Sequence, residues 1–112
     1  MTRPGTTQRA RQRIEDIRAA LQRFELLCSG TLSERMMKCG KPNCRCASDP
    51  SARHGPYYEW GFIEAGKVRH RMLSPKRAEL MRVAIGNYRK VKKLLKDWEA
   101  ETLRLIELNV PE

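Results

Sequence analysis

Aromatic side chains are scarce in this sequence, since Phe, Trp and Tyr make up only 6% of its residues. No apolar run approaches the roughly 20 residues that a membrane-spanning helix needs, and no secretory leader is recognisable. Hydrophobic residues of all kinds reach 40% of the 112 positions, which is enough for only a thin core. We therefore expect a cytoplasmic protein without a membrane segment, stabilised by a metal ion or a partner chain.

The residue constellations that carry common catalytic mechanisms are also missing. We find no nucleophile paired with a base, no paired carboxylates and no glycine-rich phosphate loop. The sequence therefore predicts a protein that is not an enzyme, with a thiol redox or metal-dependent activity as the alternative.

Acidic residues are outnumbered, because 23 Lys and Arg face 13 Asp and Glu, for a formal net charge of +10. The excess is spread over the whole length of the chain. A pI near 10.0 is typical of proteins that bind nucleic acid. The alternative is a solvated basic surface on a protein that binds another protein.

The N-terminal third predicts one helix after a short arm. Residues 1–8 contain Pro, Gly and three Thr and are expected to form a flexible basic arm. A helix is predicted from Arg9 to Cys28, ended by Ser29-Gly30. Its apolar positions recur at spacings of three and four, as in a coiled-coil seam. They are Ile14, Ile17, Leu21, Phe24 and Cys28.

The centre of the chain, residues 30–73, predicts a small β region. A strand is expected at Leu32–Met37 and a hairpin at Tyr57–Ile63 and Lys67–Leu73. A three-residue turn, Glu64-Ala65-Gly66, would close the hairpin with Gly in the left-handed conformation. This register gives the hairpin one apolar face, on which His70 is a packed residue. Its cross-strand pairs are Phe62 with Val68, Trp60 with His70 and Tyr58 with Met72.

Residues 74–108 predict a long C-terminal helix. Ser74 suits the N-cap and Pro75 the first helical position. A helix of this length must pair with the first helix, with a second copy, or with both. We expect an α+β fold of one structural domain, whose helices form an antiparallel pair or a coiled-coil homodimer. The predicted seam of this helix is Ala84, Tyr88, Val91, Leu95, Trp98, Thr102 and Leu105.

Three cysteines and one histidine follow one another at the spacing C-x4-C-x-C-x7-H. They are Cys39, Cys44, Cys46 and His54. Structural zinc takes four sulfur or nitrogen ligands in a tetrahedron, and the turn-forming residues 40–43 could bring the thiolates around one ion. The sequence therefore predicts a single structural Zn²⁺.

Cys28 is the rival fourth ligand, although a lone Cys on an apolar helical stripe is more often part of the core. The spacing matches neither ferredoxin pattern of an iron–sulfur cluster. A catalytic zinc would need an open position and a nearby base, and no Glu or second His is placed to serve as one.

The run Cys39-Gly40-Lys41-Pro42-Asn43-Cys44-Arg45-Cys46, followed by His54-Gly55-Pro56-Tyr57-Tyr58, resembles a family of small uncharacterised prokaryotic proteins. That family carries a CGKxxCxC…HGPY signature, a Gly-Lys hairpin and a long C-terminal helix. The resemblance covers about residues 30–108 and implies that the three cysteines and His54 form one site. It also implies a link to mobile genetic elements, since its members look like companions of such elements and are often labelled transposase-like.

Basic residues suggest where an anionic partner would bind. The long helix carries Arg89, Lys92, Lys93 and Lys96 at spacings of three and four, and a cationic stripe can follow a phosphate backbone. We predict a zinc-stabilised nucleic-acid-binding accessory protein. The alternative is an adaptor whose coiled-coil seam docks a transposase-like protein. Further candidate contacts are Lys41, Arg45 and Arg53 around the metal, Arg69 and Arg71 on the hairpin, and Tyr57 and Tyr58 as stacking platforms.

Overall fold

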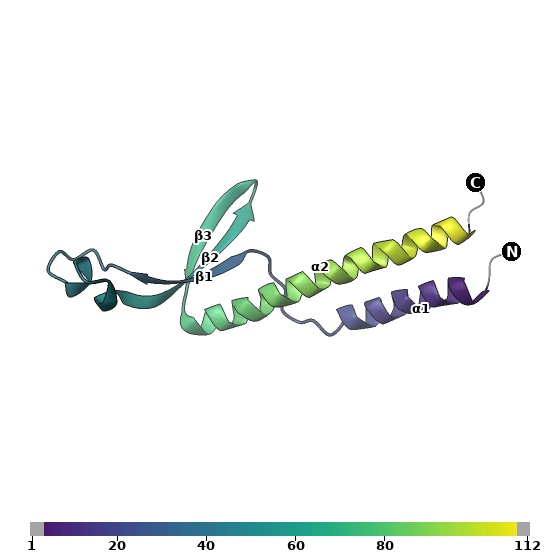
Figure 1. The fold of residues 1–112 in the computed structure, drawn as a ribbon, viewed down its shortest axis with the longest axis horizontal. Helices are drawn as coiled ribbons and strands as arrows, with labels where there is room; N and C mark the ends of the chain where they lie inside the picture. Colours follow the sequence, from purple (N-terminus) through teal and green to yellow (C-terminus); the bar gives the residue numbers. More distant parts are fainter. Residues whose placement is uncertain (1–3, 110–112) are drawn as a thin grey trace. The chain divides into compact units, whose positions relative to one another are not determined.

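A computed structural model describes residues 4–109 of the chain. Its main elements are α1 (Pro4–Leu21), β1 (Thr31–Met37), β2 (His54–Glu64), β3 (Lys67–Leu73) and α2 (Pro75–Asn109), shown in Figure 1. The expected succession of a helix, three strands and a long helix is confirmed. The chain divides into two compact units, which are described separately. Unit 1 contains residues 1–27 and 86–112, and unit 2 contains residues 28–85.

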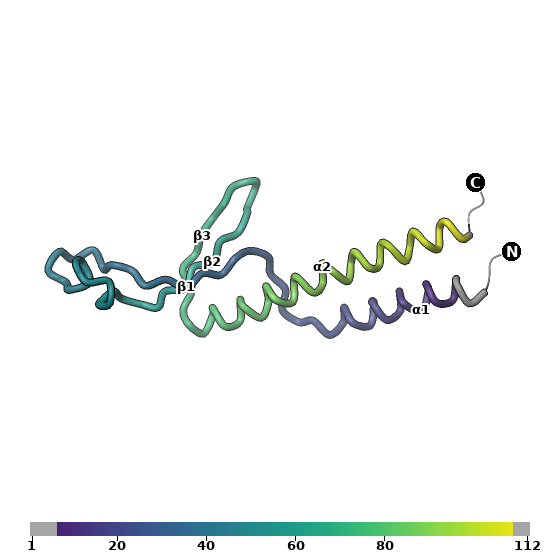
Figure 2. Tube along the Cα trace, in the orientation of Figure 1, coloured from purple at the N-terminus to yellow at the C-terminus, as the bar shows by residue number. Residues whose placement is uncertain are grey.

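Unit 1 is a helical hairpin in which α1 lies beside the C-terminal part of α2 and runs antiparallel to it (Figures 1 and 2). Its apolar contact is small, with Ala10 and Ile17 buried on α1. Glu101 is also buried and accepts a hydrogen bond from Arg13 at 3.2 Å, which joins the two helices. Arg104 donates to the same carboxylate oxygen at 3.1 Å. A shared ion pair therefore accompanies a thin apolar seam.

The predicted bounds of the first helix were wrong at both ends. Within the predicted arm, residues 4–8 belong to α1, while residues 1–3 lie outside the described residues. Pro at the first helical position costs no hydrogen bond, so Pro4 begins the helix instead of preceding it.

The C-terminal end of α1 is Leu21, and residues 24–28 are not helical. Two contacts with α2 bind the backbone that was expected to continue the helix. The side-chain amide of Asn87 donates to the Leu26 carbonyl at 2.9 Å, and the N–H of Cys28 donates to the Ala84 carbonyl at 3.3 Å. These hydrogen bonds replace the ones that the same backbone N–H and carbonyl groups would form within a helix.

The start of α2 follows the prediction, because the Ser74 hydroxyl accepts a hydrogen bond from the Arg77 N–H at 3.3 Å. Only part of the predicted seam is buried within the single chain. Ala84 is buried, but Leu95 is 46% exposed and Thr102 is exposed. Glu101 takes the inner position instead, and its ion pair with Arg13 compensates in part for burial of the carboxylate, whose Oε2 has no hydrogen-bond partner among the described residues. Within residues 4–109, no helix is long and apolar enough to cross a membrane.

Unit 2 contains an antiparallel three-stranded sheet with the order β1-β2-β3. Trp60 and Phe62 on β2 stack with their ring centroids 4.0 Å apart. The Trp60 indole N–H donates to the Ser29 carbonyl at 2.9 Å, which fixes the chain as it enters β1. Gly30 has a φ of +117°, and a Cβ there would collide with Trp60 and the Gly61 carbonyl. This close approach explains why a glycine ends the segment before the sheet.

The predicted register of the hairpin was wrong by one residue. Phe62 lies opposite Arg69, and Gly61 lies opposite His70, which is exposed instead of packed. The turn has two residues, Ala65 and Gly66, both with positive φ (51° and 77°). Two-residue turns of this kind match the right-handed twist of the strands, and this match outweighs the apolar pairing that favoured the other register. Arg71 compensates in part for the lost apolar pairing of Phe62, since its guanidinium lies 5.6 Å from the centroid of the Phe62 ring.

We expect Gly30→Ala to destabilise the protein by about 1–3 kcal/mol, because the new methyl group would collide with Trp60 in a left-handed backbone conformation. Urea unfolding followed by circular dichroism would measure the change. Gly86→Ala is the matched control, since it lies inside α2 with no atom close to the position that its new methyl group would take. That variant should be stabilised by about 0.5–1 kcal/mol. Equal stability of the two variants would contradict this account of Gly30.

Candidate metal centre

Strand pairing brings the two ends of the cysteine segment together. Met37, the last residue of β1, is the partner of His54, the first residue of β2. Cys39 follows Met37 by two residues, so pairing of the strands places it close to His54. The segment between them, residues 38–53, forms a tip at the end of the two strands (Figure 2). We call these residues the tip.

Two short 3-10 helices, η1 (Arg45–Ala47) and η2 (Pro50–Ala52), shape the tip. The N–H of Cys44 donates to the Lys41 carbonyl at 3.1 Å and closes the turn that separates the first two cysteines. Gly40 enters this turn with a φ of +84°, a conformation that glycine adopts without strain. The turn directs Cys44 back towards Cys39, and η1 directs Cys46 to the same place.

Asp49 holds the second half of the tip, and it was not among the residues predicted from the sequence. Its carboxylate accepts hydrogen bonds from the N–H and hydroxyl of Ser51, at 2.9 and 2.7 Å, and from Nε of Arg45 at 3.1 Å. The Ser51 bonds, with a further contribution from Arg45, lower the pKa of Asp49. The Asp-Pro-Ser sequence was the available signal, since Asp followed by Pro is a typical start of a helical turn.

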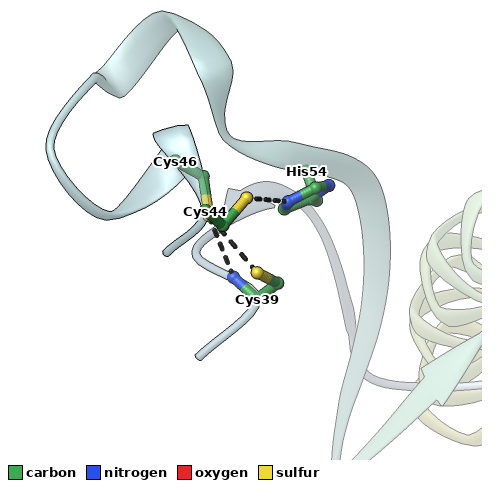
Figure 3. A group of neighbouring side chains, drawn as sticks. All are labelled: Cys39, Cys44, Cys46 and His54. Atoms are coloured by element: carbon green, nitrogen blue, oxygen red, sulfur yellow. Dashed lines mark hydrogen bonds between the residues drawn. The ribbon is translucent and has the colours of Figure 1, made fainter. Parts of the chain in front are cut away.

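The four predicted ligands are grouped around one point (Figure 3). Their ligand atoms, three sulfurs and one imidazole nitrogen, all lie within 4.8 Å of one another. The sulfur of Cys44 is 3.1 Å from Nε2 of His54, and the sulfur of Cys46 is 3.5 Å from that of Cys39. The group consists of Cys39, Cys44, Cys46 and His54.

These distances are close to those of a tetrahedral site. Metal–sulfur bonds of about 2.3 Å at tetrahedral angles place two sulfurs about 3.8 Å apart, and a sulfur and a nitrogen about 3.6 Å apart. The Cys46–Cys39 and Cys44–His54 separations need shifts of roughly 0.5 Å or less to match them. The four residues could therefore hold a metal ion with small side-chain movements.

The four ligands differ in their surroundings. Cys46 is 1% exposed, whereas Cys39 and His54 are exposed. The N–H of Cys46, together with the thiols of Cys46 and Cys39, lowers the pKa of Cys44. The N–H of Cys39 alone would lower the pKa of Cys46, but desolvation and the two neighbouring thiols outweigh it and raise that pKa. A cation at this point would favour the thiolate form of every cysteine in the group.

Neither of the other candidate ligands belongs to the group. Cys28 lies outside it, with its backbone bound to Ala84. His70 lies on β3 and approaches Glu59 at 3.4 Å. The interpretation of Cys28 as the fourth ligand is therefore not supported by the geometry, whereas His54 is correctly placed.

The predicted nucleic-acid contacts fall into two separate groups. In unit 2, Lys41 and Arg45 are exposed on the tip, and Arg53 is half-buried with an Nε that has no partner among the described residues. Arg69 and Arg71 are exposed on β3, away from the tip along β2. In unit 1, all four helical candidates are exposed on α2. They are Arg89, Lys92, Lys93 and Lys96.

A family model described as a domain of unknown function (DUF6788) matches residues 6–82. The chain belongs to this family. The match is consistent with the uncharacterised family expected from the cysteine pattern, although it begins in α1, which the resemblance did not include, and ends within α2. No curated protein matches the chain, and no solved structure matches it. The DUF6788 match therefore adds a family without adding an activity.

We expect the purified chain to contain one metal ion per molecule, measured by native mass spectrometry and elemental analysis. Cys44→Ser should lose the ion and the order of the tip, because three ligands do not close a structural site. Cys28→Ser is the matched control and should keep the full metal content. Metal-free wild-type protein with a well-folded tip, or metal loss in Cys28→Ser, would contradict this assignment of the ligands.

Proposed function

We propose that Cys39, Cys44, Cys46 and His54 hold a single structural Zn²⁺, and that the tip around it binds nucleic acid. Three thiolates and one imidazole form a ligand set that structural zinc uses commonly. All four positions of a tetrahedron would be filled by protein, so the ion would stabilise the tip and would have no open position for a substrate. The Cys39 N–H also donates to the Cys46 sulfur at 3.4 Å, a bond that stabilises a thiolate ligand.

The charge of the tip is the observation that carries the nucleic-acid proposal. Residues 38–54 contain four Lys or Arg and one Asp. That acid, Asp49, is already bound to Arg45 and Ser51. Zn²⁺ with three thiolates carries a net charge of −1, so the loaded tip would remain positive. Lys38 and Lys41 are exposed and form no ion pair within residues 4–109, which leaves both ammonium groups for phosphate oxygens.

Residues next to the tip could extend this contact surface. Tyr57 lies three residues after His54 on β2 and is 40% exposed. It pairs with Arg35 on the neighbouring strand β1. An exposed phenol ring can stack on an unpaired base, whereas the Arg35 guanidinium already lies 3.6 Å from the Glu59 carboxylate. Arg69 and Arg71 supply further cations on the exposed strand β3. We place the main contact at the tip because a bound ion would hold its cations in one ordered loop, next to the exposed ring of Tyr57.

The resemblance to companions of mobile elements suggests that the bound nucleic acid belongs to such an element. A transposase-like protein would then be a second partner, acting on the same nucleic acid. The alternative function, an adaptor without nucleic-acid affinity, would leave the basic tip as a solvated surface.

We expect the zinc-loaded chain to bind short DNA or RNA, with an affinity that falls about a hundredfold between roughly 50 and 200 mM salt if about four phosphates are neutralised. Lys38→Glu combined with Lys41→Glu should weaken binding at least tenfold, as measured by fluorescence anisotropy at several salt concentrations. Both substitutions leave the ligands intact, so metal content should stay at one ion per chain.

Arg9→Glu combined with Arg11→Glu is the control, because it changes the net charge by the same amount as the tip variant. Both side chains are exposed on α1 in unit 1. It should change the affinity much less than the tip variant. Absent binding at low salt, or equal losses in the two double variants, would remove the support for a nucleic-acid contact at the tip.

A further inference from the structure

The helix α2 presents a second apolar surface in unit 1, in addition to the one that packs against α1. Leu95, Leu103 and Ile106 are 46%, 55% and 53% exposed, and with half-buried Tyr88 and Trp98 they line an open groove of about 1070 Å³. We call this surface the outer stripe. Large exposed side chains scattered singly are normal on a protein surface, but a continuous apolar groove indicates an interaction site.

The spacing of the outer stripe is that of a helix-packing seam. Groove-lining positions recur every four and three residues along α2, which keeps them on one side of a helix over several turns. The groove-lining residues at this spacing are Tyr88, Lys92, Leu95, Glu99, Thr102 and Ile106. A second helix is the occupant that such a seam accommodates.

The charges along α2 identify which helix would fit. Residues 89–96 contain five Lys or Arg and no acid, whereas residues 97–107 contain four Asp or Glu and one Arg. A copy of α2 laid antiparallel would place its acidic half beside the basic half of the first copy. A parallel copy would place lysines beside lysines. Glu101 is buried against Arg13 and Asp97 is bound to Lys93, so Glu99 is the acid that lines the groove. An antiparallel copy would bring this acid beside the basic half of the first copy.

Free charges remain at the middle of the groove to make these contacts. Lys96 and Glu99 line the groove and form no ion pair among the described residues. Lys93, by contrast, is already bound to Asp97 at 3.1 Å, and Lys92 lies 5.7 Å from the centroid of the Tyr88 ring. About a two-fold axis near residues 95–99, Lys92 and Lys96 of each copy would lie within reach of Glu99 of the other.

We propose that the outer stripe is the interface of an antiparallel homodimer, in which two copies of α2 pack about a two-fold axis. A two-fold interface uses the same surface on both copies, so self-complementary charge is the property that it requires. The apolar side chains of the outer stripe supply the burial, and the reciprocal Lys–Glu contacts set the direction. The inference goes beyond the proposed function, because the tip and the outer stripe belong to different units. It also assigns Lys92 and Lys96 to the dimer, not to phosphate binding.

The oligomeric state of the full, metal-loaded and nuclease-treated chain tests this proposal. Sedimentation equilibrium should show a dimer at about 100 µM protein. Leu103→Glu combined with Ile106→Glu should raise the dissociation constant at least about a hundredfold, because two buried side chains would become charged. Leu80→Glu combined with Val83→Glu is the matched control, since both are exposed on α2 outside the groove and should leave the dimer intact.

A charge exchange tests the direction of packing. Lys92→Glu/Lys96→Glu and Glu99→Lys should each weaken their own homodimer about tenfold. An equimolar mixture of the two variants should form a heterodimer of wild-type affinity, since every contact regains opposite charges. A monomeric wild-type chain would overturn the proposal and leave the groove to another protein. A dimer that survives Leu103→Glu/Ile106→Glu, or a mixture that fails to pair, would overturn it as well.

Discussion

Antiparallel pairing of β1 with β2 is the constraint on which the metal centre depends. The pair Met37–His54 closes the sheet at the base of the tip. It fixes where the chain leaves the sheet to form the tip and where it re-enters the sheet. Cys46 follows Cys39 by only seven residues, so one turn and one short helix suffice to complete the group. Metal binding and strand pairing would consequently stabilise each other, because the ion ties together the same two chain ends.

The sequence predicts most of this centre because local chemistry determines it. Cysteines at a tight spacing must lie close in space, and the turn-forming residues 40–43 limit the paths between them. Ser74-Pro75 likewise predicts the start of α2, since capping and proline geometry act within a few residues. The position of His54 depends on strand pairing, and the sequence pattern placed it before a strand expected to begin at Tyr57, whereas β2 begins at His54 itself.

Non-local competition explains what the sequence did not predict. The hairpin register depended on whether Ala65 would accept a positive φ, which its side chain disfavours and the strand twist favours. Residues 24–28 carry a helical pattern, yet their backbone binds Asn87 and Ala84 of α2 instead. Glu101 breaks the apolar pattern of the inner seam because Arg13, far away in sequence, accompanies it. None of these partners can be identified from a pattern within one element. The helix α2 thus carries one stripe that packs against α1 and a second, the outer stripe, that is exposed. The spacing of its apolar residues alone does not assign each residue to one of the two stripes.

The strand β3 has a consequence for the behaviour of the protein in concentrated solution. It is an edge of the sheet, and all but its last residue are exposed, so its backbone offers unpaired hydrogen-bonding groups to any extended chain nearby. Lys67, Arg69 and Arg71 occupy three of its seven positions. Two such edges approaching each other would bring six cations together, and this repulsion keeps neighbouring molecules from joining their sheets. The basic character of the hairpin therefore disfavours association of two molecules through β3.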